Sequence, residues 1–252
     1  MTNKIAIITG GSRGLGKNTA LKLASQGVDL IITYRSQKAE ADAVVAQAQA
    51  LGVQAAAVQL DVAESKTFAA FASTVKDLLD RKWQRTNFDF LVNNAGIGIN
   101  VPFAQTTEEQ FDQLVNIQFK GVFFLTQTLL PLIADGGRII NISTGLTRFS
   151  FPGYAAYASM KGAIEVLSKY LAKELGARGI AVNVVAPGAI ETDFGGGVVR
   201  DNEQLNNHIA SVTALGRVGV PDDIGGVIAS LLSEDNRWVN AQRIEVSGGM
   251  ML

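Results

Sequence analysis

The sequence predicts an α/β fold in which one doubly wound parallel sheet carries helices on both faces. Short, nearly continuous apolar runs alternate along the chain with longer stretches that have helical spacing. Strands buried on both faces have such continuous runs, whereas strands with one solvent-exposed face alternate polar and apolar residues. No repeat, low-complexity segment or linker interrupts the pattern. We therefore expect a single domain over residues 1–252.

The expected strands are apolar runs, each of which ends at glycine, proline or polar residues. β-branched and aromatic residues favour the extended backbone, and glycine or polar clusters end it. The first run leads directly into Gly10, and the fourth leads into Asn94. In chain order, the strands are expected at 4–9, 29–34, 53–59, 88–93, 138–143, 180–186 and 243–246.

The expected helices are the longer stretches between these strands. The Ala-rich stretch 37–51 is followed by Gly52, a typical C-terminal stop, and 107–133 is interpreted as one long helix. In chain order, the helices are expected at 14–27, 37–51, 64–81, 107–133, 154–177 and 221–233.

The least regular segment is 189–220, which contains three consecutive glycines near its start. Ligands of doubly wound folds lie beyond the carboxyl ends of the strands, and this segment follows one of those ends. We therefore expect 189–220 to be a substrate lid.

Composition excludes several classes of protein. The chain has no cysteine, so disulfides, zinc–thiolate sites and cysteine nucleophiles are excluded. Its formal net charge is −1 without a long basic run, which argues against nucleic acid as a partner. No apolar run approaches the roughly 20 residues of a membrane span, and the N-terminus enters a strand without a signal-peptide pattern. We expect a cytoplasmic protein with a small-molecule substrate and no metal.

A glycine-rich turn joins the first strand to the first helix. Glycines at 10, 14 and 16 have the spacing G-x-x-x-G-x-G. Glycines let the backbone approach a pyrophosphate, and a helix N-terminus offers free N–H groups and the positive end of its dipole. The turn therefore predicts a Rossmann-type dinucleotide site. Its expected cofactor-binding residues are Gly10, Ser12, Arg13, Gly14, Leu15 and Gly16.

The end of the second strand predicts which dinucleotide binds. An NAD site usually has an Asp or Glu about 20 residues after the glycines, where it binds the ribose 2′-OH. This strand ends Thr33-Tyr34-Arg35-Ser36, without an acid. Arg35 can pair with a 2′-phosphate, and Arg13 can flank it. We therefore expect NADP(H) rather than NAD(H).

Tyr157 and Lys161 lie four residues apart in an expected helix. That spacing places a phenol and an ammonium on one helix face, where the cation would lower the phenol pKa from about 10. The pair is therefore a candidate acid/base device.

Four motifs together resemble the short-chain dehydrogenase/reductase family, and the resemblance spans the whole chain. They are the glycine turn, Asn93-Asn94-Ala95-Gly96, Tyr157-x-x-x-Lys161 and Pro187-Gly188. The resemblance implies hydride transfer between a nicotinamide and a carbonyl or alcohol carbon, with Tyr157 as general acid/base. It implies that Lys161 lowers the pKa of Tyr157 and holds the nicotinamide ribose. The other implied cofactor contacts are Asp61, Val62, Asn93, Ala95, Gly96, Pro187, Gly188, Ile190 and Thr192.

Two supporting residues depart from the family pattern. The family has a Ser about 13 residues before the Tyr, and that position is Thr144 here, with Ser143 as the alternative. A Thr hydroxyl has the same donor and acceptor capacity as a Ser hydroxyl. The family's Asn before Gly-Val-Phe is Gln118, while Asn116 lies two residues earlier on another helix face. Gln118 is the candidate for the proton-relay position.

Three other functions compete with this interpretation. Tyr154 lies seven residues before Lys161, which resembles the spacing in enoyl reductases of the same superfamily. A non-catalytic NADPH-binding module would need no titratable phenol. A serine hydrolase is disfavoured, because His208 is the only histidine and no G-x-S-x-G elbow occurs. Family resemblance also suggests a homotetramer, formed through apolar surface on the expected helices 107–133 and 154–177.

Overall fold

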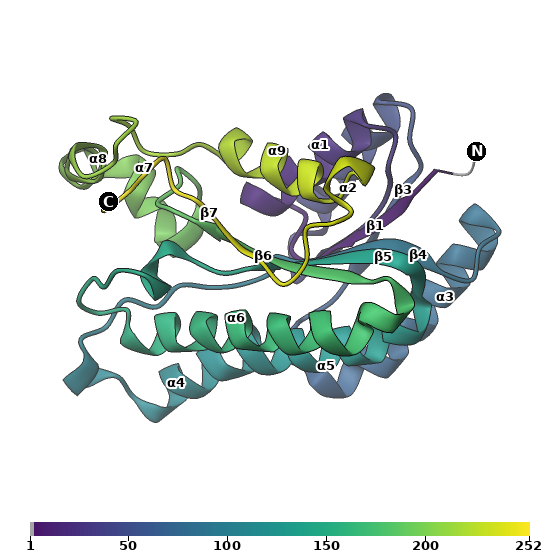
Figure 1. The fold of residues 1–252 in the computed structure, drawn as a ribbon, viewed down its shortest axis with the longest axis horizontal. Coiled ribbons are helices and arrows are strands. Elements are labelled where there is room, and N and C mark those ends of the chain that lie inside the picture. Colours follow the sequence, from purple (N-terminus) through teal and green to yellow (C-terminus); the bar gives the residue numbers. More distant parts are fainter. Residues whose placement is uncertain (1–2) are drawn as a thin grey trace.

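One parallel sheet organises the molecule, as the sequence predicts (Figure 1). The computed structural model describes residues 3–252. Within that range the sheet has the order β3-β2-β1-β4-β5-β6-β7, and every neighbouring pair is parallel. The order reverses between β1 and β4, which is where doubly wound folds bind ligands. The strands are β1 (Ile5–Ile8), β2 (Asp29–Tyr34), β3 (Ala55–Gln59), β4 (Phe88–Asn93), β5 (Ile133–Ile142), β6 (Ala181–Pro187) and β7 (Arg243–Val246).

Two helical layers cover the sheet (Figure 1). Helices α1 (Gly14–Ser25), α2 (Lys38–Ala50) and α9 (Pro221–Leu231) pack on one face. Helices α3 (Phe68–Trp83), α5 (Gly121–Leu129) and α6 (Ala155–Leu175) pack on the other. Successive residues of β1 belong to opposite cores, which explains why its sequence is apolar throughout. Across residues 3–252, none of the helices has the length and apolarity needed to cross a bilayer.

The long helix expected over 107–133 is the main error of the sequence prediction. The structure divides it into α4 (Glu108–Leu114), a π-helical segment at Val115–Lys120, α5, and a 3₁₀ turn at Leu130–Leu132. Pro131 has no N–H to continue the helix, which accounts for its end. Ile133 is not the last helical residue but the first of β5, where it pairs with Phe88. Strand β5 therefore begins five residues before the expected 138.

The segment 189–220 is more regular than its composition suggests. It contains α7 (Val198–Asp201) and α8 (Glu203–Ser211). Asn202 caps the N-terminus of α8, and its side-chain oxygen accepts from the Leu205 N–H at 2.9 Å. An isolated bridge between Ile190 and Gly219 closes the base of the segment. The residues between therefore form a structured excursion that extends beyond the carboxyl end of β6.

Candidate active site

The glycine turn is held in shape by the end of β4. The Asn94 side chain donates to the carbonyls of Thr9 at 2.9 Å and Gly10 at 3.2 Å. The Thr9 hydroxyl in turn accepts from the backbone N–H of Asn94 at 2.9 Å. A Cβ at Gly16 would lie 2.2 Å from the Gly10 carbonyl oxygen, so only glycine fits there. The backbone of the turn is therefore pre-organised before a ligand binds.

The N-terminus of α1 fits a pyrophosphate. Helix α1 begins after Arg13, and in the described part of the chain no side chain caps its first turn. Its free N–H groups and the positive end of its dipole point beyond the carboxyl ends of the strands. Ser12, Gly14 and Leu15 belong to the same turn and are partly exposed. The predicted turn residues thus lie together at one candidate anion site.

Arg35 and Arg13 are exposed at this same end of the sheet. Arg35 follows β2, and its backbone carbonyl accepts from the Gln59 side chain at 2.8 Å. Among residues 3–252 neither guanidinium makes a hydrogen bond or ion pair, so both are available to a phosphate. Asp61 and Val62 follow the neighbouring strand β3, where Asp61 accepts from the Ala63 N–H at 2.9 Å.

Tyr157 and Lys161 are buried on the face of α6 that covers the sheet. Their exposed fractions are 6% and 5%. The Lys161 Nζ donates to the Ile142 carbonyl at the end of β5, at 2.8 Å, and lies 5.8 Å from the centre of the Tyr157 ring. No carboxylate pairs with this lysine in the range the structure describes. The two side chains are thus brought together as the helical spacing predicts.

The pKa directions at this pair differ from the expectation. Burial lowers the pKa of the Lys161 ammonium to about 7. Burial also raises the pKa of the Tyr157 phenol, against a hydrogen bond from Thr144, and the nearby Tyr154 phenol adds to the rise. The predicted lowering of the phenol pKa is therefore wrong for the protein alone. Desolvation destabilises the Tyr157 phenolate and the Lys161 ammonium by more than their mutual attraction at this separation can offset.

Thr144 and Ser143 have different partners. The Thr144 hydroxyl lies near enough to Tyr157 to oppose the rise in the pKa of the phenol, and it accepts from the Leu146 N–H at 3.3 Å. Ser143 is 3% exposed, and its hydroxyl donates to Glu165 on α6 at 2.6 Å. The structure thus brings Thr144 near the phenol, whereas the Ser143 hydroxyl is bound to Glu165.

Gln118 lies in the π-helical segment and is completely buried. Its Nε2 donates to the Ile97 carbonyl, while its Oε1 has no partner among residues 3–252. A Cβ on Gly96 would lie 2.9 Å from that oxygen, so the glycine of the Asn-Asn-Ala-Gly motif makes room for the longer side chain. π-Helical turns redirect side chains and are frequent at functional sites. An unpartnered buried amide oxygen is costly, which marks it as a position for a water or ligand.

Asn93 belongs to a buried hydrogen-bond network within the fold. Its Nδ2 donates to the Thr126 hydroxyl at 3.0 Å and to the Asn141 side chain at 2.8 Å. Asn141 continues the chain by donating to Ser168 on α6 at 2.8 Å. This buried network joins β4, β5 and two helices. It is the neighbouring Asn94 and Ala95 that contact the glycine turn.

The segment after β6 lies over the catalytic candidates. Gly188 donates to the Val246 carbonyl at 3.0 Å, and Ile190 and Thr192 lead into the excursion. The ring of Phe194 lies 6.0 Å from that of Tyr157, and it fills the space next to Gly98. The sequence prediction missed Phe194. Its only signal was an aromatic residue directly before three glycines.

Comparison with known proteins identifies the family. A family profile described as enoyl-(acyl carrier protein) reductase matches residues 10–251. A 3-oxoacyl-(acyl-carrier-protein) reductase FabG of Staphylococcus aureus is 35% identical over 99% of this chain and 98% of its own length. A hydroxynaphthalene reductase-like protein of Metarhizium brunneum is 33% identical over 99% of this chain and 95% of its own length. The chain belongs to the short-chain dehydrogenase/reductase family.

Solved structures of the family superpose on the whole chain. The promiscuous reductase LugOII, which catalyses a keto-reduction in lugdunomycin biosynthesis, has a TM-score of 0.94 and 36% identity, covering 100% of this chain and 99% of its own. The angucycline C-6 ketoreductase LanV with bound NADP has a TM-score of 0.93 and 32% identity, covering 98% and 95%. The family resemblance drawn from the four motifs and the fold class are both confirmed.

Proposed function

We propose that this protein is an NADPH-dependent reductase that converts a carbonyl compound to a secondary alcohol. The observation that carries the proposal is a buried phenol, Tyr157, which has the Thr144 hydroxyl and the Lys161 amine near it. The Lys161 amine binds the carbonyl of Ile142, at the same carboxyl end of the sheet as the glycine turn. A site that only bound a nucleotide would not need a buried titratable phenol. Relatives that act on ketones, including LanV with bound NADP, support the same reaction class.

The chain offers a complete set of contacts for the cofactor. When bound, NADPH supplies the hydride that the carbonyl carbon receives. The N–H groups of the glycine turn would hold its pyrophosphate, and Arg35 with Arg13 would hold its 2′-phosphate. Asp61 and Val62 would contact the adenine, and Pro187, Gly188, Ile190 and Thr192 would line the nicotinamide.

Tyr157 would donate its proton to the carbonyl oxygen as that oxygen gains negative charge. Burial raises the pKa of Tyr157, so the phenol stays protonated at neutral pH, the form that carbonyl reduction requires. The Thr144 hydroxyl would hold the same oxygen by a hydrogen bond. Lys161 would hold the ribose and return a proton to Tyr157, and a pKa of about 7 suits that exchange. Gln118 would hold a relay water at its unpartnered oxygen.

Enoyl reduction through Tyr154 is the second candidate, and two observations favour it. The matching profile carries an enoyl reductase description, and the Tyr154 ring lies 6.3 Å from that of Tyr157. Thr144 and Lys161 nevertheless contact or approach Tyr157, which is the more buried phenol.

Separate replacement of the two tyrosines distinguishes these candidates. We expect Tyr157→Phe to lower kcat for ketone reduction by about 10²–10⁴-fold, the usual contribution of a general acid. Tyr154→Phe should retain most activity. NADPH oxidation would be followed with a panel that includes aromatic ketones, 3-oxoacyl thioesters and enoyl thioesters. Loss of activity with Tyr154→Phe alone would support enoyl reduction, and tight NADPH binding without any turnover would support a non-catalytic module.

The cofactor preference depends on Arg35. We expect Arg35→Asp to lower kcat/KM for NADPH by about 10–100-fold, because a charge-assisted hydrogen bond contributes about 1.5–3 kcal/mol. The value for NADH should not fall. Lys38→Asp, on the exposed side of the next helix, is the matched control for a change of surface charge. A wild-type preference for NADH would refute the assignment.

A homotetramer is proposed from the apolar residues that remain exposed on the outer helical layer. Phe123 and Phe124 on α5 are 38% and 41% exposed, and Val166 and Tyr170 on α6 are 55% and 63% exposed. Symmetric association would bury these side chains. Light scattering should give the mass of four chains, and a monomer would refute the proposal.

A further inference from the structure

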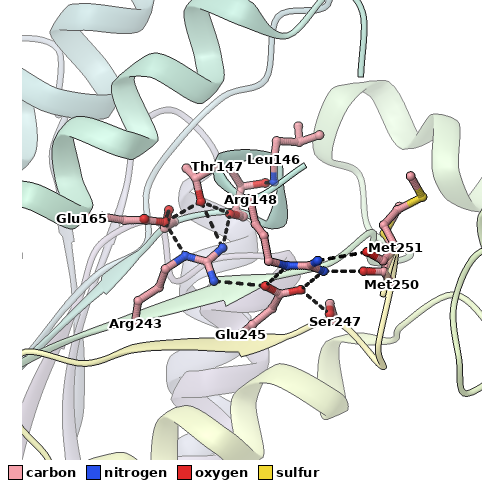
Figure 2. A network of polar contacts seen from close by, with 11 residues as sticks. Leu146, Thr147, Arg148, Glu165, Arg243, Glu245, Ser247, Met250 and Met251 are labelled. Atoms are coloured by element: carbon pink, nitrogen blue, oxygen red, sulfur yellow. Dashed lines mark hydrogen bonds and ion pairs between the residues drawn. The ribbon is translucent and has the colours of Figure 1, made fainter. Parts of the chain in front are cut away.

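A polar network connects the last strand, β7, to residues 143–147, the segment that contains Thr144. Its centre is Arg243 on β7, whose guanidinium donates to Glu165 on α6 at 2.8 Å and to Glu245 at 3.1 Å (Figure 2). The same guanidinium donates to the Thr144 carbonyl at 3.1 Å and to the Thr147 hydroxyl at 3.0 Å. One side chain thus joins β7 to α6 and to residues 144–147, both of which are far from it in sequence.

Glu165 holds the chain on both sides of Thr144. One of its carboxylate oxygens accepts from Ser143 at 2.6 Å and from Thr147 at 2.7 Å, in addition to Arg243. Ser143 directly precedes Thr144, and Thr147 ends the 3₁₀ turn that follows it. Glu165 also lies four residues after Lys161, one turn along the same helix face. The carboxylate therefore fixes the position of Thr144 relative to α6, the helix that carries Tyr157 and Lys161.

We propose that Arg243 and Glu165 are positioning residues that hold the Thr144 hydroxyl in place against Tyr157. Neither residue touches the phenol, so each acts through Thr144. The inference rests on the proposed function, in which Thr144 holds the substrate oxygen. A hydroxyl displaced by about 1 Å can cost up to about 10²-fold in rate.

Arg148 provides a matched control within the same network. Its guanidinium binds both carboxylate oxygens of Glu245 at 2.7 Å and the carbonyls of Met250 and Met251 at 2.5 and 3.0 Å (Figure 2). It makes no side-chain hydrogen bond to residues 143–147 in the described structure. Loss of Arg148 therefore tests attachment of the C-terminal segment without release of Thr144.

A double-mutant cycle tests whether Arg243 acts through Thr144. We expect Arg243→Met to lower kcat about 10-fold in the wild-type background and to have no further effect when Thr144 is already Val. Arg148→Met should lower the melting temperature with kcat retained. Equal losses of kcat from Arg243→Met in both backgrounds would overturn the proposal, because a general structural role would be additive.

The pH profile of alcohol oxidation gives a second readout. Oxidation requires the phenolate, and the Thr144 hydrogen bond lowers the pKa of Tyr157. Arg243→Met and Thr144→Val should therefore both move the rise of kcat to higher pH, whereas Arg148→Met should not. An unchanged profile for Arg243→Met would overturn the proposal.

Conservative variants guard against misfolding. Glu165→Gln keeps an oxygen that can accept from Ser143 and Thr147, so it should retain more kcat than Glu165→Ala, and equal losses would count against the positioning role. The proposed function is checked separately. If Tyr157→Phe is inactive but Thr144→Val is fully active, the positioning inference fails while the acid role of Tyr157 stands.

Discussion

The two ends of the sheet bury polar groups in different ways. At the amino end, Asp29 and Asp89 are 3% and 4% exposed, and the fold supplies their partners. Asp29 accepts from Trp83 at 2.9 Å and from the Gln54 N–H at 2.7 Å. Asp89 accepts from Lys4, Arg85 and the Ile5 N–H at 2.8–3.0 Å.

At the carboxyl end two buried groups, Lys161 and Gln118, are incompletely partnered. Lys161 has one carbonyl and no carboxylate, and the Gln118 Oε1 has no partner within residues 3–252. A buried polar group that is satisfied by the protein contributes to stability, whereas an unsatisfied one has a cost that a ligand or water can remove. The contrast supports the proposal that binding and chemistry take place at the carboxyl end, while the buried polar groups of the amino end stabilise the fold.

Replacing Lys161 is expected to give the largest effect. Lys161→Met should lower kcat by at least about 10²-fold, because the proton exchange with Tyr157 is lost. It should not lower the free energy of unfolding at pH 7, since a buried amine without a carboxylate is replaced by an apolar side chain of similar size. Lys169→Met, on the exposed face of the same helix, is the control. Near-wild-type activity of Lys161→Met would contradict the contrast between the two ends of the sheet.

Replacing Asp89 should lower stability and leave activity unchanged, which is the opposite of the result expected for Lys161. Asp89→Ala should lower the free energy of unfolding by about 3 kcal/mol, the low end for breaking a buried pair, because Lys4 and Arg85 can still reach water. Activity per folded molecule should be unchanged. Urea unfolding and kcat measured on the same preparation check both statements. Asp42→Ala, which removes only the exposed pair with Lys38, should cost less than about 1 kcal/mol. A loss of kcat without a loss of stability would contradict the assignment of this end to the fold.

The pH dependence of stability should show the smallest effect when the change is counted per pH unit. Burial lowers the pKa of Lys161 to about 7, whereas the unfolded chain would have a pKa near 10.5, so the unfolded state binds the extra proton between these values. The free energy of unfolding of the cofactor-free protein should therefore rise between pH 7 and about 10, by at most about 1.4 kcal/mol per unit. Lys161→Met should lose this rise. A slope that is the same in wild type and variant would show that another group causes it.

Sequence reasoning worked best for the elements that local sequence patterns determine. The expected bounds of β2 and β4 agree with the structure, because continuous apolar runs flanked by polar residues allow few other arrangements. The pairing of Tyr157 with Lys161 on one helix face also follows from local periodicity. The confirmed fold class and family rest on these same motifs.

The errors arose where distant segments decide the local structure. The π-helical turn at Gln118 cannot be recognised from periodicity, because the flanking helices have ordinary helical sequences. Strand β5 begins at Ile133 because β4 offers it a partner in the sheet. The direction of the Tyr157 pKa shift was mistaken because spacing reveals the neighbouring cation but not the desolvation.

By itself, the sequence determined the alternation of strands and helices, the glycine turn and the choice of candidate catalytic side chains, since these depend on residues close together in the chain. Tertiary structure alone decided the partners of those side chains. It placed Thr144 rather than Ser143 near the phenol, left the Gln118 oxygen without a partner among residues 3–252, and brought Arg243 from the last strand to residues 144–147. Burial and hydrogen bonding between distant segments set these features, and neither is encoded in local spacing.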